Sequence, residues 1–416
     1  EIIANQNLLM DAHDSGTAVT AYSGNRQIYT DSFATNNFRL RDSVRDVRTF
    51  DMNQGTNYGL AVDFTDADNF WNNVNANEDE VATDAHWGAE MTYDYFLQEH
   101  SRNSYDDNGA RILSYVHFRA NYDNAFWDGR RMTYGDGNNF KPLTSIDVCG
   151  HEIAHAVTTN TAGLIYRNES GQLNESFSDI FGNSVEAWAR PNQHSWIIGE
   201  DITTSGNGLR NMQNPNLRNH PKYYKGFRWY YGTGDNGGVH LNSGVQNYWY
   251  YLITEGDTGT NEKGDAYAIE KLGLSKAGKI AYRNLSVYLS QSSNYAEARI
   301  YAIKSAADLY GECNKEVIST TNAWFVCGVG DRYDSTTVSV DFIADTLICS
   351  TSQIVNFSNR STNFNFCIWD FGDGNTTNVI DPTHQYGTYA SFDIKLKARS
   401  CFGDNWDSLT KTAYVK

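Results

Sequence analysis

The sequence lacks any uninterrupted apolar run approaching the roughly 20 residues that a membrane-spanning helix requires, and it has neither internal repeats nor low-complexity tracts. Positive charge is also scarce: 33 Lys and Arg stand against 50 Asp and Glu, which leaves a net charge of -17. Such a surface repels phosphate backbones and anionic lipids, so we expect neither a nucleic-acid nor a membrane partner. The acidic excess is better suited to calcium, which takes oxygen ligands.

The opening residues, Glu1 to Gln6, contain no basic segment and no apolar signal-peptide core. We therefore expect that an exported form of the protein is a mature chain whose leader has been removed. An aromatic content of 14% and 34 glycines favour a folded, turn-rich extracellular protein over a disordered one. At 416 residues the chain exceeds what one core usually supports, so two or three packing units are expected.

The six cysteines predict an oxidised protein with two disulfide bonds and two buried thiols. The assignment rests on loop length and context, because six cysteines allow many pairings. The expected bonds join Cys313 to Cys327 and Cys349 to Cys401, and the expected thiols are Cys149 and Cys367.

The strongest pattern is His-Glu-Ile-Ala-His at positions 151–155, inside a stretch with helical periodicity from Ile146 to Thr159. Residues four apart share one face of a helix, so the two imidazoles can bind one metal ion. Glu152 lies one step round the helix, where it can take a proton from a water at the metal. A second predicted helix, Glu175–Ala189, supplies Glu175 as a third ligand and leaves a fourth position open, as in catalytic zinc sites.

The period of the apolar pattern divides the chain into a sheet-rich half before about residue 145 and a helical half after it. In the first half we expect a strand over Ile112–Phe118, a hairpin turn at Asp128–Gly129 and a helix over Ala85–Glu99. The metal helix lies where the halves meet, which is a natural place for a cleft. Further helices are predicted over residues 244–254, 267–289 and 295–310.

A break in composition at residues 330–337 precedes a segment with strict strand alternation. Val355 and Phe357 alternate with polar residues, and residues 392–398 do the same, which predicts a β-sandwich of roughly 80 residues. We therefore expect an α+β protein in three parts. These parts are a β-rich lobe over 1–145, a mainly helical lobe over 146–333 and a β-sandwich over 338–416.

Four blocks of the chain resemble the thermolysin family of secreted zinc metallopeptidases. The blocks are GHEIAHAVT at 150–158, TAGLIY at 161–166, NESFSDIFG at 174–182 and DNGGVHLNSG at 235–244. No third histidine follows His155 at the metzincin spacing, and no Gly-x-Met-Glu-Asn aminopeptidase motif occurs. The resemblance covers about residues 1–330 and implies a two-lobed, calcium-stabilised peptidase with a cleft between the lobes.

The resemblance assigns the centre of this cleft. His151, His155 and Glu175 match the zinc ligands, and Asp179 matches the carboxylate that orients a ligand imidazole. Glu152 matches the residue that takes a proton from the attacking water and passes it to the leaving amine.

Three further residues match those that stabilise the developing oxyanion in the family, directly or through a neighbour. His240 and Tyr166 correspond to the groups that stabilise it, and Asp235 corresponds to the carboxylate that orients the histidine.

The expected substrate contacts also follow from the resemblance. The run Asn124-Ala125-Phe126-Trp127 resembles an edge strand that pairs with an extended peptide, and Arg210 resembles the arginine that binds a substrate carbonyl. An apolar pocket implies cleavage before a bulky hydrophobic residue. Its expected lining is Phe140, Leu143, Val148, Ile198 and Leu209.

The chain departs from the family in the residues at the calcium sites. Asp147, Glu186 and Glu200 match carboxylates of a calcium cluster near the active site. Ser195 and Ile197 stand where further acids occur in its two-ion form, so we expect one ion there, because two adjacent dications with few carboxylates would repel.

Two other calcium sites of the family give different expectations. Asp66 and Asp68 resemble a second calcium loop, with a helix N-terminus stabilised by its acids as the alternative. The shortened segment at residues 203–207 lacks the expected Asp, so we expect the site there to be lost.

The C-terminal segment resembles a polycystic-kidney-disease (PKD) repeat, an immunoglobulin-like sandwich, through WDFGDG at 369–374 and DPTHQY at 381–386. Trp369 is expected to pack between the two sheets, and Asp373-Gly374 to form a turn. Such a module either holds the enzyme on insoluble protein such as collagen fibres or serves as a spacer or secretion passenger.

Individual residues also have plainer interpretations. His240 could be a surface histidine, Tyr166 a core aromatic, and Arg210 a surface ion pair. Asp179 could merely cap or solubilise its helix.

We expect a secreted, monomeric zinc endopeptidase that acts on peptide or protein substrates. The alternatives are a catalytically silent protein that uses the cleft for docking and an adhesin that depends on the sandwich. The presence of both Glu152 and His240 favours the enzyme, because a binding protein needs neither.

Overall fold

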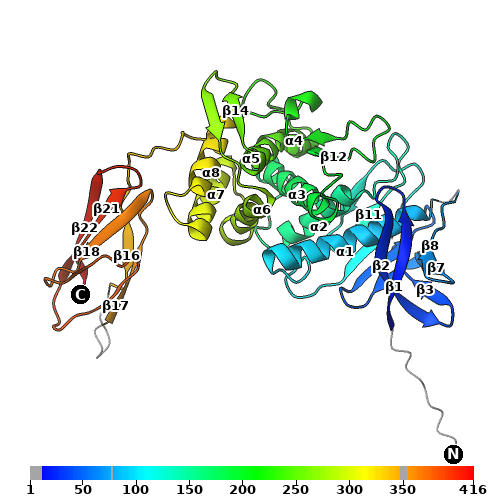
Figure 1. The fold of residues 1–416 in the computed structure, drawn as a ribbon, viewed down its shortest axis with the longest axis horizontal. Helices are drawn as coiled ribbons and strands as arrows, with labels where there is room; N and C mark the ends of the chain where they lie inside the picture. Colours follow the sequence, from blue (N-terminus) through cyan, green and yellow to red (C-terminus); the bar gives the residue numbers. More distant parts are fainter. Residues whose placement is uncertain (1–11, 76–77, 347–353) are drawn as a thin grey trace, which may run out of the picture. The chain divides into compact units, whose positions relative to one another are not determined.

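The computed structural model describes residues 12–75, 78–346 and 354–416, and within them no helix is long and apolar enough to cross a membrane. Its contacts divide the chain into two compact units (Figure 1). The first unit comprises Glu1–Ala302 and Val326–Gly330, and the second comprises Ile303–Phe325 and Asp331–Lys416. The three sequence segments proposed as domains stay predictions.

Two sheets build the beginning of the first unit. One is five-stranded, in the order β7-β3-β2-β1-β8. Its strands are β1 Ala12–Thr20, β2 Gly24–Ala34, β3 Asn37–Arg39, β7 Thr65–Asp66 and β8 Phe70–Trp71. The other follows the order β10-β11-β9-β5-β4, with β6 paired to β5. Its strands are β4 Arg41–Asp42, β5 Val47–Asp51, β6 Val62–Asp63, β9 Ile112–Val116, β10 Ala125–Trp127 and β11 Met132–Tyr134, and a short 3-10 helix, η1 Tyr58–Leu60, lies between β5 and β6.

The predicted strand and hairpin are both present in the second sheet. β9 covers most of the predicted strand, and β10 pairs antiparallel with β11 across residues 128–131. β10 stands at the end of the strand order, so one side of its backbone has no neighbouring strand within the described sheet.

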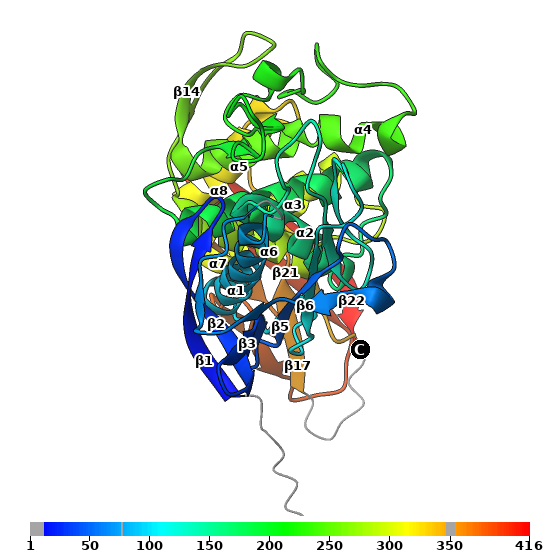
Figure 2. The same ribbon diagram turned by 90° about the vertical axis from the view of Figure 1, so that its right-hand side faces the viewer.

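Helix α1, Glu80–His100, lies between the strands and the helices that follow (Figures 1 and 2). It contains the predicted helix and begins earlier. A Cβ at Gly88 would lie 2.8 Å from the Cβ of Cys149, so the missing side chain lets α1 approach the next helix closely. Cys149 is a buried thiol, as predicted.

Helices α2, Ile146–Thr159, and α3, Asn168–Ala189, cross at two glycines. A Cβ at Gly182 would lie 2.4 Å from the backbone oxygen of Asp147, and one at Gly150 would lie 3.0 Å from the Cα of Gly182. The bounds of α2 are those predicted, whereas α3 begins before its predicted start. The close crossing brings side chains of both helices to one point.

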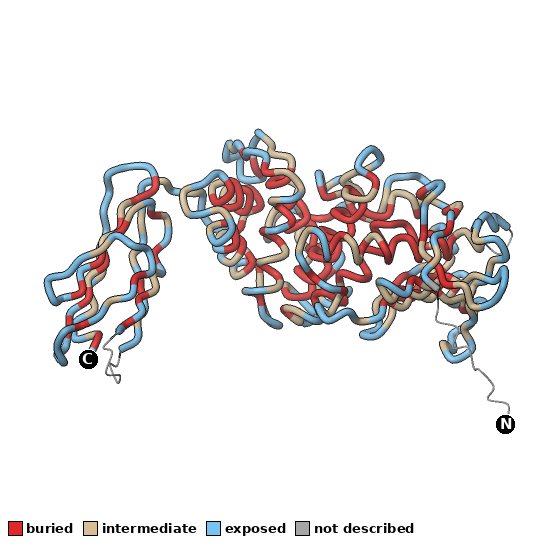
Figure 3. Tube along the Cα trace, turned by 60° about the horizontal axis from the view of Figure 1, so that its bottom comes forward, coloured by how far each residue is buried: buried red, intermediate tan, exposed pale blue. Residues whose placement is uncertain are grey.

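The rest of the first unit is mainly helical, and buried residues gather in the interior of the unit (Figure 3). Its helices are α4 Asp235–Asn242, α5 Gly244–Glu255 and α6 Leu274–Arg283, the last continued by a π-helical turn, η3 Asn284–Tyr288. Short elements also occur: β12 Ile197–Ile198, β13 Arg210–Asn211, η2 Pro215–Arg218, β14 Asp257–Thr260 and β15 Ala266–Ile269.

The prediction of one helix over residues 267–289 is wrong at its start. Residues 266–269 pair with residues 257–260 as a hairpin, and the helix begins only at Leu274. Gly273 adopts a φ of +83°, which ends the extended segment and separates it from the helix. Helix α7, Tyr295–Tyr310, has the predicted bounds, and α8, Lys315–Val326, was not predicted.

The second unit contains the predicted β-sandwich. Its sheets have the orders β16-β17-β20 and β19-β18-β21-β22. The strands are β16 Phe342–Ala344, β17 Ile354–Asn359, β18 Phe364–Asp370, β19 Thr376–Thr377, β20 Thr383–Gln385, β21 Phe392–Ser400 and β22 Trp406–Val415. Trp369 is fully buried in a core to which both sheets contribute, and Gly374 has a φ of +91° in the predicted turn.

A disulfide bond lies in the described part of this unit, and it contradicts the predicted pairing. Cys313 is bonded to Cys401, 88 residues away, whereas Cys327 is a buried thiol. The backbone of Asn363 connects the two regions, because its N–H donates to Glu312 and its carbonyl accepts the N–H of Cys401. The pairing therefore follows tertiary contacts rather than loop length. Cys367 is a buried thiol as predicted, and Cys349 lies outside the described residues.

Replacing both Cys313 and Cys401 with Ser should destabilise the second unit, because the bond restricts its unfolded chain. A loop of this size corresponds to roughly 4.6 kcal/mol in chain-entropy terms. Calorimetry without reductant measures the loss. Dithiothreitol should shift the unfolding of the unaltered protein and of the Cys367→Ala control, but not that of the double variant. A linked peptide containing Cys313 and Cys327 would contradict the assignment.

Candidate metal centre

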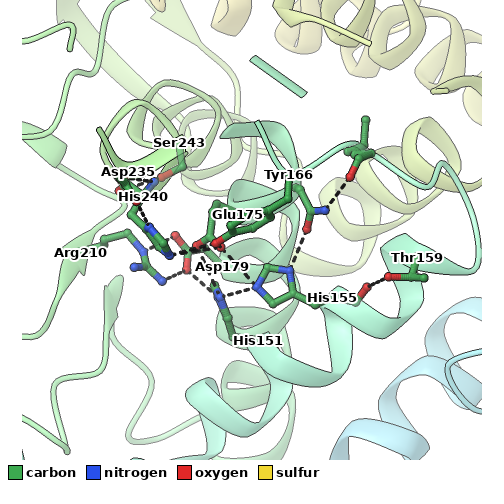
Figure 4. A network of polar contacts seen from close by, with 12 residues as sticks. His151, His155, Thr159, Tyr166, Glu175, Asp179, Arg210, Asp235, His240 and Ser243 are labelled. Carbon is green, nitrogen blue, oxygen red and sulfur yellow. Dashed lines mark hydrogen bonds and ion pairs between the residues drawn. The ribbon is translucent and has the colours of Figure 1, made fainter. Parts of the chain in front are cut away.

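Three predicted ligands meet where α2 and α3 cross (Figure 4). The Nε2 atoms of His151 and His155 are 3.0 Å apart. Glu175 Oε2 lies 3.6 Å from Nε2 of His151, and Oε1 lies 3.4 Å from Nε2 of His155. In residues 12–75, 78–346 and 354–416, no other group of three His, Cys, Asp or Glu side chains gathers its ligand atoms so closely.

The partners of the two imidazoles determine which nitrogen faces the centre. Nδ1 of His151 donates to Asp179 Oδ1 at 2.9 Å, and Nδ1 of His155 donates to Asn174 Oδ1 at 2.7 Å. The amide of Asn174 is oriented by its own donation to the carbonyl of Leu164. Both Nε2 atoms therefore present lone pairs to each other and to a carboxylate. Such an arrangement needs a positive charge between them.

The geometry fits zinc. Zinc binds these ligand types at about 2.0–2.2 Å, so tetrahedral ligand atoms lie roughly 3.3 Å apart, close to the separations found here. The second carboxylate oxygen of Glu175 is buried without a hydrogen-bond partner. Two histidines and one carboxylate leave the fourth zinc position open.

The electrostatics also favour a cation. Burial would lower the pKa of His155, but the contact with Glu175 raises it to about 9, so a proton is drawn to the place that a metal would take. Burial would likewise raise the pKa of Glu175, but His155 and His151 lower it well below its ordinary value. Glu175 is thus ionised over the whole neutral range.

Asp179 connects the metal centre to Arg210. The Arg210 guanidinium donates to both oxygens of Asp179 at 2.6 Å, and the Asn247 amide donates to Oδ2 at 2.7 Å. Burial would raise the pKa of Asp179, but Arg210 and His151 lower it to about 2. Since Asp179 is fully buried, it does not solubilise α3.

Sequence reasoning missed both asparagines of this network. Asn174 directly precedes Glu175 in a block that resembles the family, which was an available signal. Asn247 lies on α5, and nothing in its sequence context marked it.

Tyr166, His240 and Asp235 form the opposite side of the centre (Figure 4). The Tyr166 hydroxyl donates to Glu175 and lies 3.0 Å from Nε2 of His240. Nδ1 of His240 donates to Asp235 Oδ1 at 2.6 Å, and its backbone N–H donates to Oδ2. Tyr166 is an exposed residue rather than a core aromatic, and the His240 side chain is 47% exposed.

The turn that joins Asp235 to His240 requires unusual backbone angles. Residues 236–238 all have positive φ, with +88° at Gly237 and +74° at Gly238. Two glycines make this turn accessible, and it folds the Asp235 carboxylate back onto the histidine. No simple periodicity predicts such a helix, which explains why α4 was not predicted.

A cavity of about 630 Å³ opens beside the ligands and contains Glu152 in its wall. The predicted substrate contacts are together in the same wall: Asn124, Ala125, Phe140, Leu143, Val148, Ile198, Leu209 and Arg210. Trp127, Leu164 and Ile202 also contribute, and the last two were not predicted. The cavity combines an apolar section with the polar groups of the metal centre.

The predicted calcium carboxylates lie outside this cavity. Burial, Asp147 and Glu200 raise the pKa of Glu186 to about 9, and burial with Asp147 raises that of Glu200 to about 7. One oxygen each of Glu186 and Glu200 is buried without a partner. The other Glu186 oxygen accepts from Arg190, which also contacts Asp201.

The two other predicted calcium ligands form turns. Asp66 Oδ1 accepts the N–H of Asp68, and Asp68 Oδ1 accepts the N–H of Phe70. The alternative of a helix N-terminus is wrong, because strands β7 and β8 occupy this segment.

Replacing Asp179 with Asn should weaken zinc binding by about 10- to 100-fold, because the His151 imidazole loses its anionic acceptor. Competition with a chelator measures the affinity. Asp31→Asn is a matched control, since Asp31 is buried and accepts two hydrogen bonds from Arg39 far from the metal ligands. Equal zinc affinity in the two variants would contradict this role of Asp179.

Two helices that present two histidines and a glutamate to a cleft, beside a second glutamate, define the zinc-metallopeptidase class of proteins. Matches to models of protein families identify the family within this class. The model described as thermolysin metallopeptidase, catalytic domain, matches residues 15–159, and the alpha-helical domain of the same family matches residues 162–329. The chain belongs to the thermolysin (M4) family, which implies zinc at this centre.

Curated relatives are similar over more than half of the chain. A bacillolysin of Brevibacillus brevis is 42% identical over 300 residues, covering 70% of this chain and 53% of the relative. A thermolysin of Alicyclobacillus acidocaldarius is 46% identical over 262 residues, covering 61% and 46%. The chain thus spans about half the length of these relatives.

Solved structures also match. The precursor of protealysin, a metalloproteinase from Serratia proteamaculans, aligns at 31% identity and a TM-score of 0.57, covering 68% of this chain and 87% of that chain. The PKD1 domain of a Vibrio cholerae metalloprotease aligns with 18% of this chain and 93% of that one, at 26% identity and a TM-score of 0.16. That score is too low to support a conclusion, and the sandwich rests on its own strands and core.

Proposed function

We propose that this protein is a zinc endopeptidase that hydrolyses peptide bonds in extracellular proteins. The observation that carries the proposal is the pair of imidazole lone pairs facing Glu175, with the Glu152 carboxylate in the same cavity. The Cys313–Cys401 disulfide supports an oxidising, extracellular location. That the protein is a monomer stays a prediction from the sequence.

Proton transfer belongs to Glu152 in this proposal. Zinc held by His151, His155 and Glu175 would act as a Lewis acid and lower the pKa of a water towards about 7. Glu152 takes the proton from the attacking water and delivers it to the leaving amine.

His240 and Tyr166 donate to the oxyanion as it develops, and Asp235 keeps the imidazole in place. Although the residue as a whole is exposed, desolvation of its hydroxyl and the charge of Glu175 raise the pKa of Tyr166, so the hydroxyl keeps a proton to donate.

Substrate binding uses the two remaining parts of the cleft. The free side of β10 pairs with an extended peptide, and Arg210 binds a substrate carbonyl while Asp179 holds its guanidinium. The apolar wall accepts a bulky hydrophobic side chain directly after the scissile bond.

Replacing Glu152 with Gln should lower kcat by roughly 10²- to 10⁴-fold on casein, because Gln cannot accept the proton. Zinc content should stay unchanged. Glu255→Gln, which alters a glutamate paired with Lys271, serves as the control and should retain full turnover. Undiminished turnover by zinc-loaded Glu152→Gln protein would disprove the proposal.

Cleavage sites in a casein digest by the unaltered protein should precede bulky hydrophobic residues, whereas an acidic or basic preference would exclude the assigned pocket.

We further propose one calcium ion at Asp147, Glu186 and Glu200. The unpartnered oxygens and raised pKa values of the two glutamates support a cation there. Arg190 already neutralises part of the cluster through Glu186 and Asp201, which supports one ion rather than two. Asp66 and Asp68 remain a candidate second site.

Calcium should raise the thermal midpoint of chelator-treated protein, because it binds only the folded carboxylate cluster. Glu200→Gln should reduce this shift, while Glu255→Gln should not. Metal analysis after dialysis is expected to find one to three calcium ions per zinc, and a higher ratio would contradict the assignment.

The role of the sandwich also stays a prediction. We infer that it is a PKD-like module, which either retains the enzyme on insoluble protein such as collagen or acts as a spacer. Fibre binding by the chain with and without residues 338–416 distinguishes these roles.

A further inference from the structure

One segment of this acidic protein contains no acidic residue. From Ile202 to Gly234 there is neither Asp nor Glu, although the whole chain has 50 of them. The same segment contains five cations: Arg210, Arg218, Lys222, Lys225 and Arg228. In a chain with a net charge of -17, this is a marked separation of charge.

The second half of that segment also exposes large apolar side chains. Phe227 is 85% exposed, Tyr231 73% and Leu217 67%. Single exposed apolar residues are ordinary on protein surfaces, whereas several within one loop beside cations are characteristic of binding surfaces. We name the group Leu217, Lys225, Phe227, Arg228 and Tyr231 the aromatic ledge.

Contacts connect several of these residues and their neighbours. The Arg228 guanidinium lies 5.7 Å from the ring centre of Phe227 and donates to Asn219, two residues after Leu217. The Tyr231 hydroxyl donates to the carbonyl of Lys225. These contacts hold Arg228 beside Phe227 and Tyr231 beside Lys225.

The cations of the ledge are available to an anionic partner. Two acids face it: Glu169 accepts from the Tyr224 hydroxyl, and Glu262 accepts the backbone N–H of Phe227. Within the described ranges, neither Lys225 nor Arg228 forms an ion pair with a carboxylate. The Lys225 ammonium lies over the Tyr224 ring, and only an amide oxygen accepts from Arg228.

The ledge adjoins the cleft. Both backbone groups of Tyr230 bond to the Asn242 side chain, at 2.9 and 3.0 Å. The Tyr230 ring packs on Gly238, where an added Cβ would lie 2.7 Å away. Tyr230 directly precedes Tyr231 of the ledge, so these contacts hold the ledge near α4, the helix that carries His240. The segment begins at Ile202, and Ile202, Leu209 and Arg210 all line the cavity.

We propose that the aromatic ledge binds a part of the substrate polypeptide that lies outside the cleft, and that it selects acidic segments containing apolar side chains. This inference rests on the proposed peptidase function. Phe227 and Tyr231 contact the apolar side chains, and Lys225 and Arg228 pair with carboxylates. Two observations favour substrate as the occupant: the charge is complementary to an acidic peptide, and the segment that carries the ledge also contributes Ile202, Leu209 and Arg210 to the cavity wall.

The test compares substrates that share one scissile bond. A blocked dipeptide fills only the cleft, whereas two longer peptides add a tail of about ten residues, either acidic and aromatic or with Lys replacing each acid. Tails are placed on each side of the bond in turn. The unaltered protein should cleave the acidic-tailed peptide with a kcat/KM roughly tenfold higher than that of the basic-tailed one on one side.

Two double variants remove the ledge: Phe227→Ser with Tyr231→Ser, and Lys225→Glu with Arg228→Glu. Both should abolish the acidic preference through KM and leave dipeptide hydrolysis unchanged, because the dipeptide does not reach the ledge. Val44→Ser with Lys279→Glu is the matched control. It changes an apolar residue that is 68% exposed and an exposed cation, neither of them in the cavity wall, and should keep the preference. Preserved preference in the ledge variants, or equal losses on the dipeptide, would overturn the inference.

A binding measurement separates the ledge from the catalytic proposal. Fluorescence anisotropy of the acidic-tailed peptide is measured with Glu152→Gln protein, with and without the ledge substitutions. If the unaltered protein hydrolyses nothing, the peptidase proposal fails, and weaker binding by the ledge variants still supports the ledge. Equal binding overturns it. So does sedimentation showing that the same substitutions dissolve a dimer, because the occupant would then be a second copy.

Discussion

The close crossing of α2 and α3 is the contact on which the metal centre depends. Gly150 and Gly182 let the helices approach until the backbone of one would collide with any side chain on the other. Only at this separation do two imidazoles from α2 and a carboxylate from α3 come within 3.0–3.6 Å of one another. Three lone-pair donors at that distance are stable only around a cation, so packing determines the chemistry.

Buried charges connect the metal centre to the wall of the cleft. Asp179 holds a ligand imidazole on one side and Arg210 on the other, so the metal centre and a cavity-wall residue share one anion. Removing one member would leave another buried charge unpaired, which is costly. Arg210 also belongs to the segment without acids that leads to the aromatic ledge.

The second unit is held together by a covalent bond as well as by packing. Residues 303–325 belong to the segment matched by the family's alpha-helical domain, yet their contacts group them with the β-sandwich. The Cys313–Cys401 bond links the loop between α7 and α8 to the end of β21. The sandwich is therefore tied to these helices at two points, the chain itself and the disulfide, and is more than an appendage on a linker.

The local sequence pattern was sufficient to predict those features that lie within a single helix or strand. The bounds of α2 and α7, the ligand spacing within α2 and the alternating burial along residues 392–398 all follow from residues close in sequence. The hairpin before α6, the positive-φ turn of α4, the Asn247 contact and the Cys313–Cys401 bond were decided only in three dimensions. Each depends on which distant segments of the chain come into contact, and the periodicity of side chains along the sequence carries no information about such contacts.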